Sequence, residues 1–396
     1  MTIVLKCFKQ KIKIIILLIT LFNLVTLAQG EYKLIDIRGF WDSSHHWYDI
    51  NDEEKTIYPL PDQQKYKRTD ITKIADNILL FQKNNGGWAK NYDMLAILTD
   101  EQKDAIINSK DETNTTFDNG TTHSQIAYLA EVYLTTKEEK YKEALMKGIE
   151  FILSAQYENG GWPQFYPDTT GYRKYITFND GAMVGIMSVL QAVVNNREKY
   201  NFIDGELFNK IKTSYEKGLD CILKCQINEN GILKAWCQQH DNVDFHPQNA
   251  RTFEPAAVCS NESVGIVYLL MNVINPEEKI VNSINAAVKW FNDSKIYGIK
   301  VETVKAQHED FEYHSTDYDK IVVEDKDAPP IWARFYELQT NVPLFCNRDG
   351  QPVYSLAEVQ RERRTGYAWY GYDPAELLKI YPEWQKKWSL DKNVLN

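Results

Sequence analysis

The sequence predicts a fold dominated by α-helices, an α/α-toroid of three stacked helical hairpin repeats with long loops and a few short strands. The first observation behind this prediction is an internal repeat, Gln-x-x-Asn-Gly-Gly-Trp, at residues 82–88 and 156–162. A degenerate third copy starts at residue 226, and each copy follows a stretch with helical apolar spacing. The second observation is a polar loop, Thr-Phe-Asp-Asn-Gly at 116–120 and Thr-Phe-Asn-Asp-Gly at 177–181, which precedes another helical stretch. Together they give a repeat unit of about 70 residues, in which two helices flank a Gly-rich loop and a polar loop.

The N-terminal residues 1–28 have the features of a secretory signal peptide and are set aside from the fold. A basic start with four lysines leads into an apolar stretch at 14–25, and the small residues that signal peptidase needs end at Ala28. A membrane anchor is the alternative, but the apolar stretch is short for a membrane span. We therefore expect a mature chain from Gln29 that is secreted or periplasmic, without stable membrane insertion once the signal is removed.

Residues 29–396 are expected to form a single domain, because no low-complexity linker divides them. Up to about residue 70 the chain is polar and rich in Trp and Tyr, with little periodicity. Helical patterns then follow in pairs, and the Gly of each Asn-Gly pair is expected to end its helix in a left-handed turn. The patterns cover 74–80 with 124–134, 144–153 with 182–194, and 219–223 with 264–273.

The last hundred residues show a different pattern. From about residue 296 the helical spacing fades, and short strands are expected at 299–301 and 320–323. Helical spacing returns at 355–363 and 374–387.

Charge and composition narrow the function classes. With 45 basic against 55 acidic residues the formal net charge is -10, which argues against nucleic-acid binding through a basic surface. Aromatic residues make up 13% of the chain, a proportion that also suits a sugar-binding protein. The sequence has no zinc-protease, phosphate-loop, nucleophile-elbow or dinucleotide motif. Cys221 and Cys225 are expected to be buried thiols rather than half of a zinc site.

The polar loops hold the residues that could carry chemistry. Asp118 and Asp180 are expected to occupy equivalent positions just before helices in two repeats, and each could simply cap its helix. Two carboxylates on one face, together with Asn or water oxygens, could instead hold Ca²⁺. The third loop carries Arg251, which either pairs with Glu254 or binds an acidic ligand. Arg334 lies in a run of aromatic residues, where a buried Arg–Glu pair is the alternative to ligand binding.

Six motifs in order carry a resemblance to a known family. They are Asn-Gly-Gly-Trp-Ala-Lys-Asn at 85–91, Thr-Phe-Asp-Asn-Gly at 116–120, Gly-Gly-Trp-Pro-Gln-Phe-Tyr-Pro at 160–167, Ile-Thr-Phe-Asn-Asp-Gly-Ala-Met at 176–183, Ala-Arg-Thr-Phe-Glu at 250–254 and Trp-Ala-Arg-Phe-Tyr-Glu at 332–337. Each motif alone is weak, but six at compatible spacing are specific. On these motifs the sequence resembles the pectate lyases of polysaccharide lyase family 10, over about residues 72–372.

The resemblance implies a catalytic α/α-toroid domain that cleaves polygalacturonate, an α-1,4-linked galacturonate chain, by Ca²⁺-assisted β-elimination to 4,5-unsaturated oligogalacturonides. It implies Asp118 and Asp180 as Ca²⁺ ligands with Asn119 beside them, and Arg251 as the base that removes the C5 proton. It implies Arg334 as a partner of a substrate carboxylate. The further substrate-binding candidates are Lys90, Lys320, Trp162 and Tyr166, of which the aromatic residues offer stacking faces to sugar rings. We also expect a monomer with a pectate chain as its partner.

The chain departs from the family pattern at three positions. Ala89 replaces the usual Pro, Lys320 stands where Arg is frequent, and Gly181 follows Asp180 where a second acid sometimes appears. The last departure would weaken Ca²⁺ binding. An Arg base is itself demanding, because its unperturbed pKa is about 12.5 or above. Neighbouring cations and partial burial favour the neutral form that can accept a proton.

Two other functions remain open at this stage. A glycoside hydrolase on an α/α-toroid would use paired carboxylates as acid and base. A non-catalytic pectin-binding protein would need only the stacking faces of Trp162 and Tyr166. The Gln-x-x-x-Gly-x-Trp repeat also resembles that of terpene cyclases, but their acidic Asp-x-Asp-Asp cluster is absent from the sequence.

Overall fold

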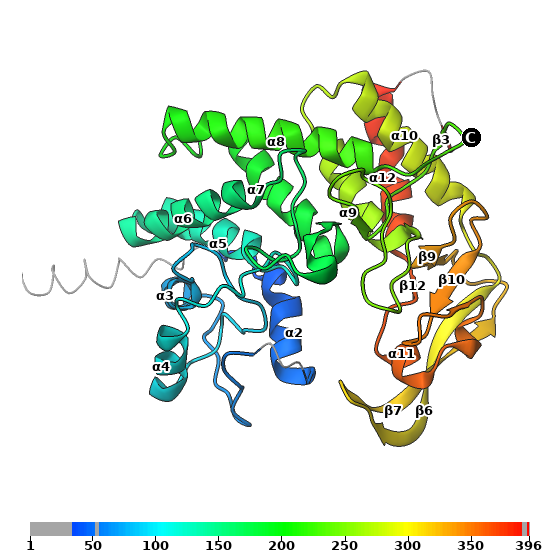
Figure 1. The fold of residues 1–396 in the computed structure, drawn as a ribbon, viewed down its shortest axis with the longest axis horizontal. Helices are drawn as coiled ribbons and strands as arrows, with labels where there is room; N and C mark the ends of the chain where they lie inside the picture. The colour runs from blue at the N-terminus through cyan, green and yellow to red at the C-terminus, as the bar shows by residue number, and fades with distance from the viewer. Residues whose placement is uncertain (1–33, 52–54, 390–393, 396) are drawn as a thin grey trace, which may run out of the picture.

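The structure is a computed structural model that describes residues 34–51, 55–389 and 394–395. The predicted signal peptide, residues 1–28, lies outside these described residues. All but the last of the long helices lie before residue 295, and the longer strands come after that point (Figure 1). The long helices are α3 (Ile71–Phe81), α5 (His123–Thr136), α6 (Glu139–Ala155), α7 (Ala182–Asn195), α8 (Gly205–Cys225), α9 (Ser260–Met271), α10 (Glu278–Asp293) and α12 (Asp373–Trp388).

These helices pack in a row of neighbouring pairs. Helix α5 lies against α6, α7 against α8, and α9 against both α10 and α12. The pairs stand side by side, because α5 also contacts α7 and α7 contacts α9. Side chains such as Ile126, Ile186 and Ile266 on these facing helices are fully buried. The hydrophobic core therefore runs along the row of helices. The loops that join the helices lie at the helix ends, along the edge of this row, where they can form a site.

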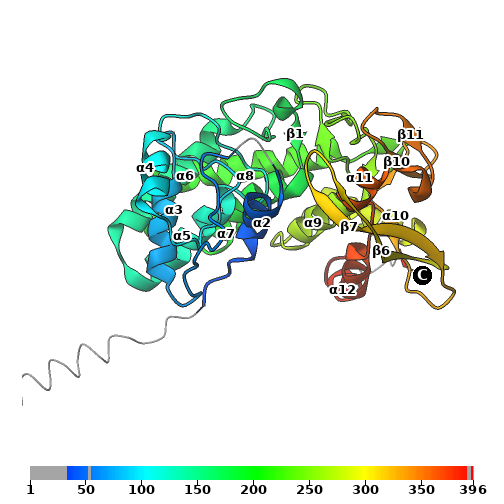
Figure 2. The same cartoon turned by 90° about the horizontal axis from the view of Figure 1, so that it is seen from below.

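The prediction of an α-dominated α/α-toroid with a few short strands is wrong. The row of helices is open, because α3 at one end and α12 at the other lie on opposite sides of the molecule in both views (Figures 1 and 2). The C-terminal part instead builds antiparallel sheets. Strand β6 (Ile299–Asp310) pairs with β7 (Ser315–Glu324), and a four-stranded sheet runs in the order β11-β10-β9-β5. Its strands are β5 (Val258–Cys259), β9 (Phe335–Tyr336), β10 (Pro343–Cys346) and β11 (Pro352–Val353).

The hairpin β6–β7 is much longer than the two short strands predicted from the sequence. From 299 to 303 the residues Ile, Val and Thr alternate with Lys and Glu, a pattern typical of a half-buried strand. Beyond them the strands are mostly polar and exposed, so hydrophobic periodicity gave no sign that pairing continues. Short two-residue strands pair elsewhere: β1 (Ile176–Thr177) with β4 (Gln239–His240), β2 (Asn228–Glu229) with β3 (Ile232–Leu233), and β8 (Trp332–Ala333) with β12 (Tyr370–Gly371).

Glutamine, rather than the Asn-Gly pair, follows the end of each repeat helix. Helices α3, α6 and α8 are followed by Gln82, Gln156 and Gln226 in extended conformation. The Gln82 side-chain amide donates to the carbonyl oxygens of Gly86 and Ala144, both at 2.9 Å. Gln156 and Gln226 make the same pair of bonds, one within their own loop and one to the next outer helix. Each Gln therefore ties a loop to the neighbouring repeat.

A buried tryptophan anchors each loop after a repeat helix. The indole N–H groups of Trp88, Trp162 and Trp236 donate to carbonyl oxygens of the preceding helix at 2.8 to 2.9 Å. Trp332 makes the same bond to Phe291 of α10, so the structure shows a fourth copy that the sequence repeat did not reveal. All four indoles are wholly buried. The backbone after each tryptophan is thus held in a fixed position.

The remaining helices are short. They are α2 (Trp41–Asp49), α4 (Asp100–Asn108), α11 (Arg361–Thr365) and the 3-10 turns η1 (Arg38–Phe40), η2 (Gly171–Lys174), η3 (Asn179–Gly181) and η4 (Leu356–Glu358). Helix α2 lies in the N-terminal stretch for which the sequence predicted little regular structure. Within the described part of the chain, no helix combines the length and apolar character needed to cross a membrane.

Candidate active site

The residue two positions after each buried tryptophan belongs to one polar cluster. Lys90, Gln164, Gln238 and Arg334 occupy these positions in the four copies. Lys90 Nζ lies 3.1 Å from Asp118 Oδ2, and Gln164 Nε2 donates to Asp118 Oδ1 at 2.9 Å. The first and second copies therefore hold Asp118 between them.

The third and fourth copies hold Asn179 in the same way. Gln238 Nε2 donates to Asn179 Oδ1, and Arg334 Nη2 donates to the same oxygen at 3.2 Å. Asn179, not Asp180, is thus the counterpart of Asp118. Asp180 corresponds to Asn119, and both have left-handed backbones with φ of 50° and 51°. Asp and Asn are exchanged between the two loops, so the sequence-based view that the two aspartates are equivalent is off by one residue.

This exchange gives the two carboxyl groups different charge environments. Burial would raise the pKa of Asp118, but the Lys90 charge and the hydrogen bond from Gln164 outweigh it and hold the pKa below its usual range. Burial raises the pKa of Asp180 well above its usual value, and the neighbouring charges of Asp118 and Glu262 raise it further. The site therefore holds one carboxylate with a bonded cation and one that is short of positive charge.

Arg334 is buried beside the second loop. Its Nη2 donates to Glu262 Oε1 at 2.7 Å, and its guanidinium carbon lies 4.6 Å from the centre of the Tyr367 ring. Its Nε is buried without a hydrogen-bond partner among the described residues. Burial opposes the charge, but Tyr367 and Glu262 outweigh it and raise the Arg334 pKa. Arg334 thus has the buried pair that sequence reasoning offered as an alternative, and one donor left over.

Arg251 is bonded to a buried carboxylate. Its Nε and Nη2 donate to the two oxygens of Glu254 at 2.8 and 2.6 Å, and the Tyr367 hydroxyl donates to Glu254 at 2.9 Å. Glu254 is 2% exposed, whereas 43% of the Arg251 side chain is exposed. Burial alone would lower the Arg251 pKa, but Glu254 outweighs it and raises the pKa well above its usual value. Without a ligand the protein therefore holds Arg251 as an oriented cation.

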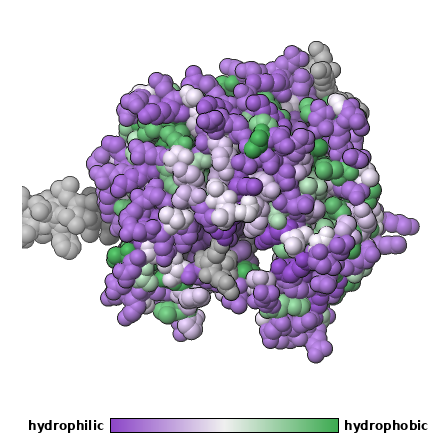
Figure 3. All heavy atoms as spheres, in the orientation of Figure 1, coloured by the Kyte–Doolittle hydropathy of each residue, from purple (hydrophilic) through white to green (hydrophobic). Residues whose placement is uncertain are grey.

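The charge of Arg251 also acts on both aspartates, which places it at the same cluster. Further arginines stand behind it, because the guanidinium groups of Arg251, Arg348 and Arg363 lie 4.9, 5.3 and 4.6 Å from the centre of the Phe253 ring. Arg251, Arg348 and Arg363 thus gather around Phe253 and form a group that we call the basic border. Figure 3 shows a hollow between the helical part and the hairpin β6–β7, with mostly hydrophilic residues at its rim.

The structure brings the other candidates only partly to this cluster. Lys320 lies on β7 opposite Thr303, and burial lowers its pKa. Its charge acts on His314, as do those of Arg348 and Arg363, so it belongs with the basic border. Trp162 is 0% exposed and serves the core, so its ring offers no face to a sugar. Tyr166 is half-buried, with its ring 5.7 Å from that of Phe151.

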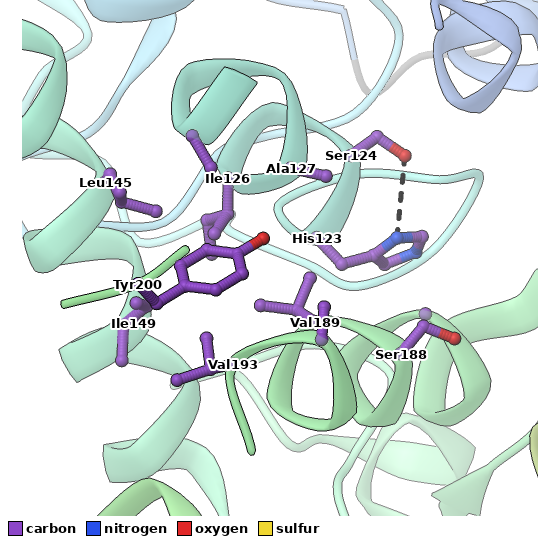
Figure 4. A pocket seen from close by; sticks show the side chains of 13 residues that line it. His123, Ser124, Ile126, Ala127, Leu145, Ile149, Ser188, Val189, Val193 and Tyr200 are labelled. Carbon is purple, nitrogen blue, oxygen red and sulfur yellow. Dashed lines mark hydrogen bonds between the residues drawn. The ribbon is translucent and has the colours of Figure 1, made fainter. Parts of the chain in front are cut away.

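The cavity between α5, α6 and α7 is a separate feature. It has a volume of about 320 Å³ and is lined mainly by apolar side chains, with His123, Ser124 and Ser188 on its polar side (Figure 4). Burial lowers the pKa of His123 to about 4, so the imidazole is neutral. A neutral, apolar pocket is unsuited to an anionic ligand, and the charged cluster remains the better candidate for the active site.

Comparisons with known proteins agree with this choice. The pectic acid lyase family model matches residues 82–378, which include the four tryptophan loops. The chain belongs to the pectic acid lyase family. It is similar to a mutant family 10 polysaccharide lyase from Cellvibrio cellulosa in complex with trigalacturonic acid, at 32% identity and a TM-score of 0.66, over 80% of this chain and 92% of that one. A second structure of a family 10 lyase from that organism gives the same identity and TM-score over 78% and 91%. Comparison with curated proteins gives no match.

As a pectate lyase, the chain carries site residues that sequence reasoning missed. Gln164, Gln238 and Glu262 had no assigned role, and Tyr367 lay outside the motifs. A signal for the first two was present, because Trp-Pro-Gln and Trp-Cys-Gln stand in register with Trp-Ala-Lys and Trp-Ala-Arg. No comparable signal pointed to Tyr367, which is 113 residues from Glu254 in the chain and reaches it only through the fold.

The residues present fit a divalent cation that is completed by substrate. Within the described ranges, no three His, Cys, Asp or Glu side chains come close enough to form a metal site by themselves. Among the residues that the structure describes, Asp180 has no cationic hydrogen-bond partner, and the Nδ2 of the buried Asn119 amide has no partner. Rotation of the Asn119 side-chain amide by half a turn would present its oxygen at this position. Two carboxylates and an amide give too few of the six to eight oxygens that Ca²⁺ takes.

Proposed function

We propose that this pectate lyase cleaves polygalacturonate by Ca²⁺-assisted β-elimination, with Arg251 as the base at C5. The observation that carries the proposal is that Arg251 and Arg334, from separate parts of the chain, both bring positive charge to Asp180, and Arg251 also to Asp118, in a chain of the pectic acid lyase family. The related Cellvibrio structure with trigalacturonic acid supports an acidic galacturonate chain as the substrate.

The chemistry requires charge to be offset at a carboxylate. The C5 proton lies next to the substrate carboxylate, so negative charge builds on that group as the proton leaves. Ca²⁺ held by Asp118, Asp180 and Asn119 together with substrate oxygens would supply positive charge there. Arg334 offers its unpartnered Nε as a donor to a substrate carboxylate.

The proton transfer is assigned to Arg251. The proton moves to a guanidine nitrogen, the C5–H electron pair becomes the C4–C5 double bond, and the bond from C4 to the glycosidic oxygen breaks. The leaving oxygen takes a proton from solvent. Glu254 orients the guanidine and stabilises the guanidinium once the proton has arrived, as the aspartate of a catalytic triad does for histidine. The same pairing disfavours the neutral base beforehand, so activity should rise toward alkaline pH.

Ultraviolet absorbance of the unsaturated product, with and without a chelator, tests the proposal on purified residues 29–396. Polygalacturonate should give the chromophore, and the chelator should abolish it. Reducing ends without the chromophore would indicate hydrolysis, and full activity in chelator would exclude the metal. We also propose export with cleavage after Ala28, and the mass of the mature N-terminus tests this.

A further inference from the structure

Helix α2 adjoins the loop that carries Asp118. The turn η1 before it packs so closely that a Cβ on Gly120 would collide with the Gly39 carbonyl oxygen. Burial raises the pKa of Asp42 in the first turn of α2, and the Asp118 charge adds to this effect. The start of α2 is therefore a direct neighbour of the proposed reaction centre.

The other end of this segment reaches the C-terminal part. The Asn51 backbone N–H donates to the Tyr313 carbonyl oxygen at 3.2 Å, and Tyr313 lies in the turn between β6 and β7. In both views α2 stands on the side of the helical part that faces this hairpin (Figures 1 and 2). Helix α2 thus borders the site from the Asp118 loop to the tip of the hairpin.

The two faces of α2 differ in their side chains. Trp47 is wholly buried and donates to the Ile57 carbonyl oxygen at 2.8 Å, and Ser43 accepts from the Tyr92 backbone at 3.1 Å. On the opposite face Trp41 is 66% exposed. Its ring stacks on that of His45, with centroids 5.2 Å apart and planes at 10°.

This stack is held in place before any ligand arrives. His45 Nδ1 lies 2.9 Å from Asp49 Oδ2, so an ion pair or hydrogen bond fixes the imidazole one turn further along. The imidazole covers one face of the Trp41 indole and leaves the rest open to solvent. An aromatic face that is already oriented loses little conformational freedom when it binds.

We propose that the Trp41–His45 stack is an outer subsite that binds one sugar ring of a pectate chain beyond the reaction centre. The inference rests on the proposed function, because a polymer held at Asp118 and Asp180 must continue over neighbouring surface and α2 adjoins the Asp118 loop. The C–H face of a pyranose ring is apolar and packs on an indole, whereas the carboxylate stays in water. Residues 41–49 precede the stretch 82–378 that matches the family, so the subsite would be an addition to the matched region.

Steady-state kinetics of Trp41→Ala, Trp41→Phe and Tyr297→Ala test the subsite on long polygalacturonate and on trigalacturonate. Tyr297 is equally exposed at 66% and lies between α10 and β6, so it is the matched control. Trp41→Ala should raise the KM for the polymer about tenfold with little change in kcat, and Trp41→Phe should recover most of the affinity. The penalty should be smaller on the trimer, and Tyr297→Ala should match the wild type.

Equal penalties on polymer and trimer, or an unchanged KM in Trp41→Ala, would overturn the subsite and leave the lyase proposal intact. Affinity electrophoresis in polygalacturonate gels measures binding without catalysis, so it tests the subsite independently of the lyase proposal. A wild type that makes no unsaturated product would overturn the lyase proposal. A slower-migrating wild type than Trp41→Ala in such gels would still support the aromatic subsite.

Discussion

The loop before α5 and the loop before α7 share a left-handed pair of residues but place their carboxylates differently. The left-handed pair is Asn119-Gly120 in the first loop and Asp180-Gly181 in the second. In the first loop the carboxylate precedes this pair and is bonded to Lys90 and Gln164. In the second loop a neutral Asn precedes it, and the carboxylate lies one residue later. There Asn179 donates to the carboxylate at 2.5 Å, and no lysine or arginine of the described chain is hydrogen-bonded to it.

The difference teaches that one repeat unit can supply two roles. The position held by Asp118 and Asn179 lies between two tryptophan loops and receives a hydrogen bond from each. An acid at this position is therefore stabilised as an anion. Within the described residues no tryptophan-loop donor reaches the next position, so an acid there lacks that stabilisation of its charge. On one side of the site the carboxylate of Asp118 is held by hydrogen bonds. On the other side the carboxyl group of Asp180 is buried near more negative than positive charge.

Removing either carboxylate should have the largest effect. Asp118→Ala and Asp180→Ala should each lower kcat/KM by about a thousandfold or more, because both groups are proposed Ca²⁺ ligands. The assay is product absorbance on polygalacturonate at saturating Ca²⁺, with circular dichroism as the folding control. If folded Asp118→Ala protein stays active, Asp118 is only a structural residue of its loop.

The base and the carboxylate partner should give different kinetic patterns. Arg251→Lys should lose kcat almost as fully as Arg251→Ala, by about a hundredfold or more, because a flexible ammonium cannot present the planar guanidine to C5. Arg334→Ala should raise KM as well as lower kcat, since it loses a contact with bound substrate. Should Arg251→Lys keep most of its kcat, Arg251 is an electrostatic clamp and Lys320 becomes the first candidate base.

Conservative substitutions should separate the two loops by stability. Asp118→Asn removes the carboxylate charge that pairs with Lys90 and should cost about 2 kcal/mol in the free energy of unfolding. Asp180→Asn should cost nothing at neutral pH, because the raised pKa means that ionised Asp180 destabilises the fold. The contribution of Asp180 to the free energy of unfolding should fall as the pH rises above 3.8, the ordinary pKa of an aspartate. Asp180→Asn should remove this pH dependence. Urea titration from pH 4 to 8 measures both, and equal losses would contradict the contrast.

The smallest expected effect is a displaced pH profile. Glu254 raises the pKa of Arg251, so Glu254→Gln should lower that pKa and move the rising limb of kcat toward lower pH. The plateau should fall, because the guanidinium formed in the reaction loses its counter-charge. Tyr367→Phe, which keeps the carboxylate and removes one donor, is the matched control and should shift the limb less. An unmoved limb in Glu254→Gln would mean that Arg251 does not titrate in the rate-limiting step.

Candidate residues for the site could be picked out from the sequence and remain predictions, whereas the overall architecture was predicted wrongly. The helices near 124–134 and 182–194 were found because their buried faces repeat every three to four residues. Helix α2 was missed because its core face is only Ser43 and Trp47, too few residues to set a period. The long hairpin β6–β7 was missed because exposed pairing leaves little hydrophobic pattern.

The sequence by itself determined the family, the order of the loops and which residue types they carry, because each of these is encoded in short stretches of consecutive residues. The tertiary structure decided which oxygen each donor reaches. Lys90 and Asp118 are 28 residues apart, and Arg334 and Asn179 are 155 apart. Their pairing depends on how successive tryptophan loops stack. Because a carboxyl pKa depends on burial and on the nearest charges, the roles of Asp118 and Asp180 follow from that stacking, and only their identity follows from the sequence.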